Sequence, residues 1–219
     1  MRCAGGEVVS EAKNLHLVDG PLARQKLKAL RDENTSTPEF RQAMKELALI
    51  VVAEATHSMP TNTVRVRTPL AETEVQEISD PVCLVPVLRA GLGMLEGALA
   101  LLPDATVGFV GLQRDEETAE PVEYYVNLPR NLHEYLVLVL DPMLATGGSL
   151  AATLGKLKQY GARWISCAHA VAAAPGVERV TREHPDASFY TAAVDPGLDE
   201  RAFIVPGLGD AGDRLYGTL

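Results

Sequence analysis

The sequence predicts an α/β domain in which helices flank a central parallel sheet. Two observations lead to this prediction. From residue 82 onward, short apolar runs alternate with stretches of helical spacing. Runs such as Leu136–Leu140 are apolar at every position, which is typical of strands buried on both faces. The length of 219 residues suits one large domain, and 47% hydrophobic residues can fill its core.

The N-terminal part is predicted to be helical. Residues 1–18 are interpreted as an extension with little structure of its own, so a single domain is expected over residues 19–219. A first helix is expected over Pro21–Asp32. A second helix begins at Ser36, because a hydroxyl cap followed by an early proline and an early glutamate favours a helix start, and it runs to about Thr56.

The elements that follow alternate between strands and helices. Thr63–Arg67 alternates in polarity and is expected to pair with Glu74–Ile78. Buried strands are then predicted at Val82–Leu88, Val107–Leu112, Tyr135–Leu140, Trp164–Ala172 and Ser188–Val194, with helices at Ala90–Leu102, Leu150–Tyr160 and Val177–Glu183. Ligands of parallel sheets bind in the loops at the carboxyl ends of strands. Those loops are 89–93, 113–121 and 141–149, together with the late segment 206–213.

The loop Asp141–Ser149, with the sequence DPMLATGGS, has the features of a phosphate-binding turn. Gly147 and Gly148 let the backbone turn tightly and bring its N–H groups against an anion at the start of a helix. Thr146 and Ser149 add hydroxyl donors. Asp141 could accept hydrogen bonds from sugar hydroxyls or position a hydrated cation. The alternative is an ordinary strand-to-helix turn capped by Ser149.

Two arginines occupy corresponding places after other strands. Arg89 follows the strand Val82–Leu88, and Arg114 follows Val107–Leu112, so both are expected to reach the ligand crevice. Arginines that merely end a strand are the alternative. Arg114 also opens an acidic excursion to Glu123, which is interpreted as part of a protruding β-arm at about residues 113–129. A solvated charged loop is the alternative.

The segment Pro206–Asp213 is rich in glycine. Gly207, Gly209 and Gly212 would let backbone groups approach a flat ligand edge to edge, and Asp210 adds a carboxylate. A C-terminal cluster of turns is the alternative.

Several function classes lack their motifs. The chain has neither the GxxxxGK[ST] of nucleoside-triphosphate loops nor a complete GxGxxG. Its five histidines show no metal-ligand spacing and none neighbours a serine or cysteine nucleophile. The net charge of −9 argues against nucleic-acid binding.

The cysteines and the N-terminus predict a location. Cys3, Cys83 and Cys167 show no CxxC spacing, which is typical of a reduced protein. Residues 1–10 lack the apolar core of a signal peptide, and the longest apolar region, Val82–Leu102, is broken by charges and glycines. A cytoplasmic protein without a membrane partner is expected.

Taken together, VPVLRAGLGM, GLQRDEETAEPV, VLDPMLATGGSL and IVPGLGDAGDRLYGT closely resemble the uracil phosphoribosyltransferase family over about residues 20–219. The lone acid at Asp141-Pro142, where many phosphoribosyltransferases carry two, distinguishes this branch. The resemblance implies the type I phosphoribosyltransferase fold with an N-terminal helical segment. It also implies a pyrimidine-salvage reaction in which uracil and phosphoribosyl diphosphate give UMP and diphosphate.

The resemblance also implies roles for particular residues. Asp141, Arg114 and Asp210 would be catalytic, and uracil would be held by Ile204, Gly209, Asp210 and Ala211. Phosphoribosyl diphosphate would be held by Arg89, Arg114, Asp141, Pro142, Met143, Leu144, Ala145, Thr146, Gly147, Gly148, Ser149 and Asp210. Mg²⁺ would bind mainly through substrate oxygens and water rather than protein ligands. A homodimer or higher homo-oligomer is implied, and GTP is a candidate effector.

Two rival functions stay open at this stage. The first is a phosphoribosyltransferase for another base, such as cytosine, xanthine or orotate. The second is a regulatory protein that reuses the fold to bind RNA or a nucleotide. The charge of −9 argues against RNA, and the presence of Arg89, Arg114 and Asp141 favours turnover.

Overall fold

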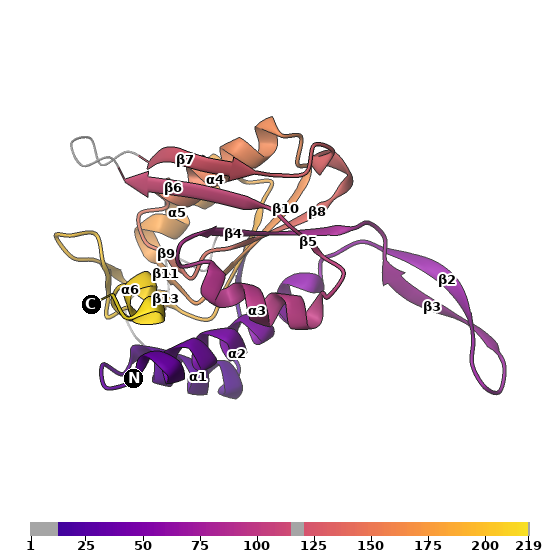
Figure 1. Ribbon diagram of the computed structural model, residues 1–219, viewed down its shortest axis with the longest axis horizontal. Helices are drawn as coiled ribbons and strands as arrows, with labels where there is room; N and C mark the ends of the chain where they lie inside the picture. The colour runs from indigo at the N-terminus through magenta and orange to yellow at the C-terminus, as the bar shows by residue number, and fades with distance from the viewer. Residues whose placement is uncertain (1–12, 115–120, 219) are drawn as a thin grey trace.

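The main sheet of the domain follows the predicted parallel plan (Figure 1). The structure is a computed structural model and describes residues 13–114 and 121–218. Within these residues the eight-stranded sheet has the order β1-β12-β10-β8-β4-β6-β7, with β5 paired to β4. Its strands are β1 Leu15–Leu17, β4 Val82–Leu88, β5 Thr106–Val107, β6 Phe109–Arg114, β7 Pro121–Asn127, β8 Leu136–Leu140, β10 Trp164–His169 and β12 Ser188–Thr191. All neighbours are parallel except β6 and β7.

Helices cover both faces of the sheet, which explains why central strands such as β8 are apolar at every position (Figure 1). On one face lie α1 Pro21–Arg31, α2 Thr37–Thr56 and α3 Leu92–Leu101; on the other lie α4 Gly148–Gln159 and α5 Ala174–Glu183. In β8, Leu138 and Leu140 pack with the first group, while Val137 and Val139 pack with the second. All four are fully buried because successive side chains point to opposite faces.

The start of α2 shows the predicted local chemistry. Glu39 accepts hydrogen bonds from the Ser36 amide at 3.0 Å and the Ser36 hydroxyl at 2.6 Å, and Pro38 occupies the first turn. This capping box satisfies donors that a helix start otherwise leaves unpaired.

Three predicted strands are each divided in two. The second halves of two of them, β11 Val171–Ala173 and β13 Val194–Asp195, join β9 Met143–Leu144 in a small parallel sheet of order β13-β11-β9. The division between β10 and β11 has a visible cause, because the amides of Ala170 and Val171 both donate to the Pro142 carbonyl at 3.1 Å. The small sheet therefore continues from the carboxyl ends of β8, β10 and β12. The remaining division, between β5 and β6, falls at Gly108.

One prediction about the periphery needs correction. Residues 1–12 lie outside the described part, but Leu15–Leu17 of the presumed extension pairs with Phe189–Thr191 as an edge strand of the main sheet. The hairpin β2 Thr61–Arg67 with β3 Glu72–Ile78 stands away from the body (Figure 1). The arm expected at 113–129 includes parts of the antiparallel strands β6 and β7; its residues 115–120 lie outside the described part, so its projection stays a prediction.

The remaining elements are short. They are a 3-10 turn at Leu132–Glu134, the antiparallel pair β14 Gly197–Leu198 and β15 Ile204–Val205, and the C-terminal helix α6 Ala211–Tyr216. Among the described residues, no helix has the length and apolar character needed to cross a membrane.

Candidate functional site

The candidate site lies where the connections of the main sheet change direction. From β4 the chain passes through α3 to β6 on one side, and from β8 it passes through α4 to β10 on the other. β4 and β8 are neighbours, with Pro86 opposite Leu140. Arg89 and Asp141 follow these two strands, so they flank the crevice at the switch point where open parallel sheets bind ligands.

The loop Asp141–Ser149 ends in an uncapped helix start. Gly147 adopts φ +77°, a left-handed conformation that favours glycine, and no side chain caps the N-terminus of α4 there. The Thr146 hydroxyl lies 3.4 Å from the amide nitrogen of Gly148, and Ser149 is exposed. Amides at such a terminus, reinforced by the helix dipole, form a binding site for an anion.

Asp141 is held at the strand end by its backbone. Its amide donates to the Ala168 carbonyl at 3.1 Å, and its carbonyl lies 2.7 Å from Nδ1 of the buried His169. Burial raises the pKa of the Asp141 carboxyl from 3.8 to about 7, while the Met143 amide at 3.4 Å lowers it slightly. The residue as a whole keeps part of its surface accessible. The carboxyl is therefore shielded from bulk water and can be reached from the loop.

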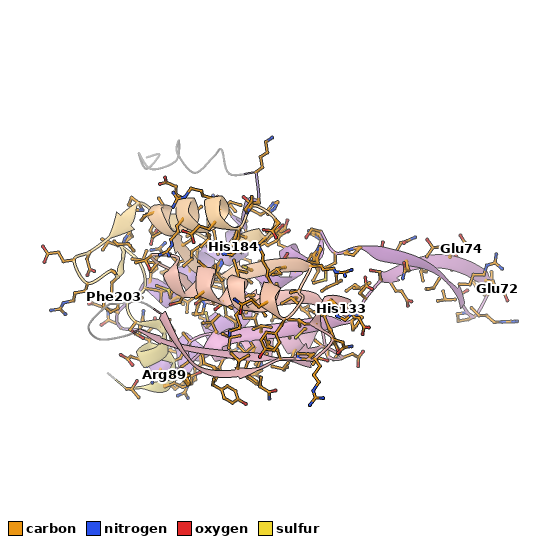
Figure 2. The ribbon with its side chains drawn as sticks, turned by 90° about the horizontal axis from the view of Figure 1, so that it is seen from above. Glu72, Glu74, Arg89, His133, His184 and Phe203 are labelled. Atoms are coloured by element: carbon orange, nitrogen blue, oxygen red, sulfur yellow. The ribbon has the colours of Figure 1, made fainter. Side chains whose placement is uncertain are left out.

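Arg89 extends from the neighbouring strand end. Its guanidinium lies 3.4 Å from the Asp213 carboxylate of α6, and its carbonyl accepts from the Tyr216 hydroxyl at 3.2 Å. The side chain is 59% exposed, so an anionic ligand can reach it. Arg89 and Phe203 lie at the end of the molecule opposite the β2–β3 hairpin (Figure 2).

The loop of Arg89 is packed tightly onto β8. A Cβ atom on Gly91 would lie 2.3 Å from the Leu140 carbonyl oxygen and 2.7 Å from that of Val87. Real side chains never approach so closely, so only glycine allows this contact. It sets the Arg89 loop against the strand end that carries Asp141.

The glycine-rich C-terminal segment closes the other side. Asp210 is the N-cap of α6, where its carboxylate accepts from the Asp213 amide at 2.9 Å. Gly207 and Gly209 adopt φ values of +55° and +76°. A pocket of about 270 Å³ lies between this segment and the loop Asp141–Ser149, called the phosphate loop below. Its lining includes Ala90, Met143, Ala145, Phe203, Ile204, Gly209, Asp210 and Ala211.

The structure thus brings the predicted residues together from three segments. Within the loop Asp141–Ser149, Pro142 and Leu144 are buried, and the Pro142 carbonyl already accepts from the amides of Ala170 and Val171. Arg114 is the last residue of β6, next to β4 in the sheet, but its side chain lies outside what the structure describes.

Sequence reasoning missed three nearby groups. A Cβ on Gly148 would lie 3.3 Å from Nη1 of Arg179 in α5, so this cation stands beside the phosphate loop. The other two are Arg31 and Asp195, which form a bidentate ion pair behind the C-terminal glycines. The sequence carries a signal for Asp195, because Asp195-Pro196 follows a predicted strand as Asp141-Pro142 does. It carries no such signal for Arg31 and Arg179, which lie within helices.

Comparison with known proteins identifies a family model and relatives that match this chain. The family model described as uracil phosphoribosyltransferase matches residues 17–218. The curated uracil phosphoribosyltransferase of Thermoanaerobacter sp. (strain X514) is 46% identical over 94% of this chain and 99% of its own length. That of Symbiobacterium thermophilum is 49% identical over 92% of this chain and 97% of its own.

A solved structure agrees as well. The AQ2163 protein from Aquifex aeolicus superposes with a TM-score of 0.87 at 37% identity, covering 92% of this chain and 97% of its own. The resemblance expected from four sequence motifs is confirmed over nearly the whole chain. The chain belongs to the uracil phosphoribosyltransferase family.

Proposed function

We propose that the protein transfers the 5-phosphoribosyl group of phosphoribosyl diphosphate to N1 of uracil, which yields UMP and diphosphate. The pocket between the loop Asp141–Ser149 and the C-terminal glycines carries this proposal, because it would hold a sugar phosphate and a flat base side by side. Family membership supports uracil as the base.

The phosphorylated sugar would be held by Asp141–Ser149. The amides at the start of α4 would bind its 5-phosphate, and the Asp141 carboxylate would accept from the ribose hydroxyls. Arg89 and Arg114 would bind the diphosphate. Asp210, which stands between the pocket and α6, would face both substrates.

The residues present fit Mg²⁺ bound mainly by substrate and water. No three His, Cys, Asp or Glu side chains cluster as a metal site in residues 13–114 or 121–218. Asp141 offers one shielded carboxyl, and burial raises its pKa to about 7. That is the setting in which Mg²⁺ takes one carboxylate and otherwise substrate oxygens. When bound, the ion neutralises charge on the diphosphate.

The reaction depends on placement and electrostatics. The C1–O bond to diphosphate breaks, the bond from uracil N1 to C1 forms, and the N1 proton is released. Positive charge develops on the ring and negative charge on the leaving diphosphate. Arg89 and Arg114 would stabilise the leaving group, while the pocket would hold N1 in line with C1.

Base selection would come from backbone groups. Ile204 and Gly209–Ala211 line the pocket and can present backbone amides to O2 and O4 of uracil and a backbone carbonyl to its N3–H. Cytosine would be rejected, because its amino group would face donors and leave polar groups unpaired.

The test is UMP formation from uracil and phosphoribosyl diphosphate, with cytosine, xanthine and orotate as competing bases in a diphosphate-release assay. Turnover with one of these bases and none with uracil would favour the rival transferase. Salt-dependent binding of RNA on a filter, without turnover, would favour the regulatory rival.

Assembly as a homodimer or higher homo-oligomer is supported by the β2–β3 hairpin. It carries Val66, Val75 and Ile78 at 37–39% exposure, and Leu70 at its turn is 97% exposed. Because exposed apolar groups on a protruding element mark interaction sites, light scattering should give a mass above that of one chain.

Two further proposals concern an effector and the location of the protein in the cell. The candidate GTP effector rests on the resemblance alone and is tested by titrating GTP into the turnover assay. The cytoplasmic location is tested by cell fractionation.

A further inference from the structure

We propose that Arg31 and Asp195 position the backbone segment 206–210 that contacts uracil, and so set the affinity for the base. Neither residue lines the pocket. This inference rests on the proposed uracil activity. It assigns to these residues an effect on the base that exceeds their effect on phosphoribosyl diphosphate, because Asp210 is the one proposed ligand of that substrate in the segment.

The Asp195 carboxylate is the centre of the arrangement. Arg31 donates from Nη1 to Oδ2 and from Nη2 to Oδ1, each at 2.8 Å. The amide of Gly207 donates to Oδ2 at 2.9 Å. Nη1 of Arg31 also donates to the Gly207 carbonyl at 3.0 Å. Both backbone polar groups of Gly207 are therefore bonded to this ion pair.

A second arginine holds the next residue along. Arg214 of α6 donates from Nη1 to the Leu208 carbonyl at 2.8 Å and bonds the carbonyl of Leu30 with the same nitrogen. Its Nη2 donates to the Asp32 carbonyl at 2.6 Å. The end of α1 is thus tied to two consecutive residues that directly precede Gly209.

Hydrogen bonds are well suited to set the shape of this segment. Gly207 and Gly209 have no side chains to pack, and both adopt positive φ. Asp195 is only 5% exposed, so its charge is shielded from water and its bonds are directional. A shift of Gly207 would pass directly to Gly209 and Asp210, which line the pocket.

The pair is separable from the packing of α1. That helix buries Ala23, Leu27 and Leu30 in the core, and Lys26 forms an ion pair with Glu46 of α2 at 2.5 Å. Breaking the Lys26–Glu46 pair removes an ion pair between α1 and α2 without changing any contact of segment 206–210. Glu46→Gln is therefore the matched control.

The test compares Arg31→Lys, Asp195→Asn, Asp195→Ala and Glu46→Gln by steady-state kinetics, at a temperature where circular dichroism shows each variant folded. We expect Arg31→Lys and Asp195→Asn to raise KM for uracil about tenfold or more, since each loses a charge-assisted hydrogen bond. KM for phosphoribosyl diphosphate should rise by less than about threefold, because Asp210 is the one of its proposed ligands that lies in this segment and the loop Asp141–Ser149 is untouched. Selectivity for uracil over cytosine should fall.

Two comparisons separate positioning from a general structural role. Asp195→Asn should bind uracil better than Asp195→Ala, since its amide oxygen can still accept from Gly207. Glu46→Gln should keep both KM values. Equal rises in the two KM values, a loss of kcat alone, or the same uracil defect in Glu46→Gln would overturn the inference.

Formation of UMP by the wild-type protein distinguishes failure of the proposed function from failure of the inference about Arg31 and Asp195. If the wild-type protein forms no UMP, the proposed function and the inference both fail. If it forms UMP and the Arg31 and Asp195 variants bind uracil normally, only the inference fails.

Discussion

Replacing Asp141 with asparagine should stabilise the free protein at alkaline pH while it removes activity. Burial raises the pKa of this carboxyl from 3.8 to about 7, so the ionised form is disfavoured in the folded chain. Asparagine has nearly the same shape, can still accept from the Met143 amide, and carries no charge. Under the proposed function, the loss of the carboxylate should nevertheless lower kcat/KM strongly, because the ribose hydroxyls and Mg²⁺ would lose their anionic partner.

The size and sign of the effect follow from linkage. Because the pKa of Asp141 rises from 3.8 to about 7 on folding, ionisation of this carboxyl lowers the free energy of unfolding by at most about 4 kcal/mol. Because Asp141 keeps part of its surface accessible, we reduce this to about 1–3 kcal/mol. The folded state binds more protons than the unfolded state between pH 4 and about 7. The contribution of Asp141 to stability is therefore most favourable below about pH 4 and is lost as the pH rises towards 7.

The assay is thermal unfolding of wild type and Asp141→Asn at pH 5 and pH 8 without substrate. A chain of this length changes its Tm by about 2–4 °C per kcal/mol, so the variant should melt several degrees higher at pH 8. The gain should be smaller at pH 5. A variant that melts at or below the wild-type temperature at pH 8, or a gain independent of pH, would refute the argument.

Asp186→Asn is the control of opposite sign. The Lys158 ammonium at 2.6 Å lowers the pKa of the Asp186 carboxyl, so its ionised form is favoured in the folded chain. Removing this charge should give no gain at pH 8. A gain equal to that of Asp141→Asn would mean that loss of any carboxylate stabilises the protein.

Three further predictions follow. The acidic limb of the profile of kcat/KM for phosphoribosyl diphosphate should have an apparent pKa near 7 from ionisation of Asp141, and a wild-type profile flat from pH 6 to 8 would contradict this. Gly91→Ala should lower both Tm and kcat/KM, because its Cβ would overlap backbone atoms of two adjacent strands. Gly155 of α4 is the control, because a Cβ there would meet open space. Gly155→Ala should leave activity intact and raise the free energy of unfolding by about 0.5–1 kcal/mol. Burial raises the pKa of the Cys83 thiol to about 11 and that of Cys167 well above its usual value, so peptide mapping should find neither labelled by a thiol reagent at pH 8 before denaturation.

Local patterns predicted much of the fold. The helix α2 was predicted from Ser36 to Thr56 because a capping box and an early proline act within a few residues of the chain. The strand β8 was predicted within one residue, because burial on both faces leaves no polar position in it. The pairing of β2 with β3 followed from alternation.

Features that depend on distant partners were not predicted. Leu15–Leu17 becomes a strand because β12 offers it an edge, and a three-residue segment carries no periodicity of its own. β10 ends at His169 because the next two amides bond to the Pro142 carbonyl. The projection of the hairpin β2–β3 was not predicted either, since projection depends on which elements the body of the domain leaves uncovered.

By itself, the sequence determined the chemistry at the strand ends: an apolar strand must stop where Asp141 begins, and paired glycines must turn the chain into α4. It also determined the family. Only the tertiary structure decided that Arg31 and Asp195 bond to Gly207 in the C-terminal glycine-rich segment, and that Arg179 stands beside the loop Asp141–Ser149. Motifs report contacts formed within one stretch of chain, whereas these side chains meet their partners only after distant elements have packed.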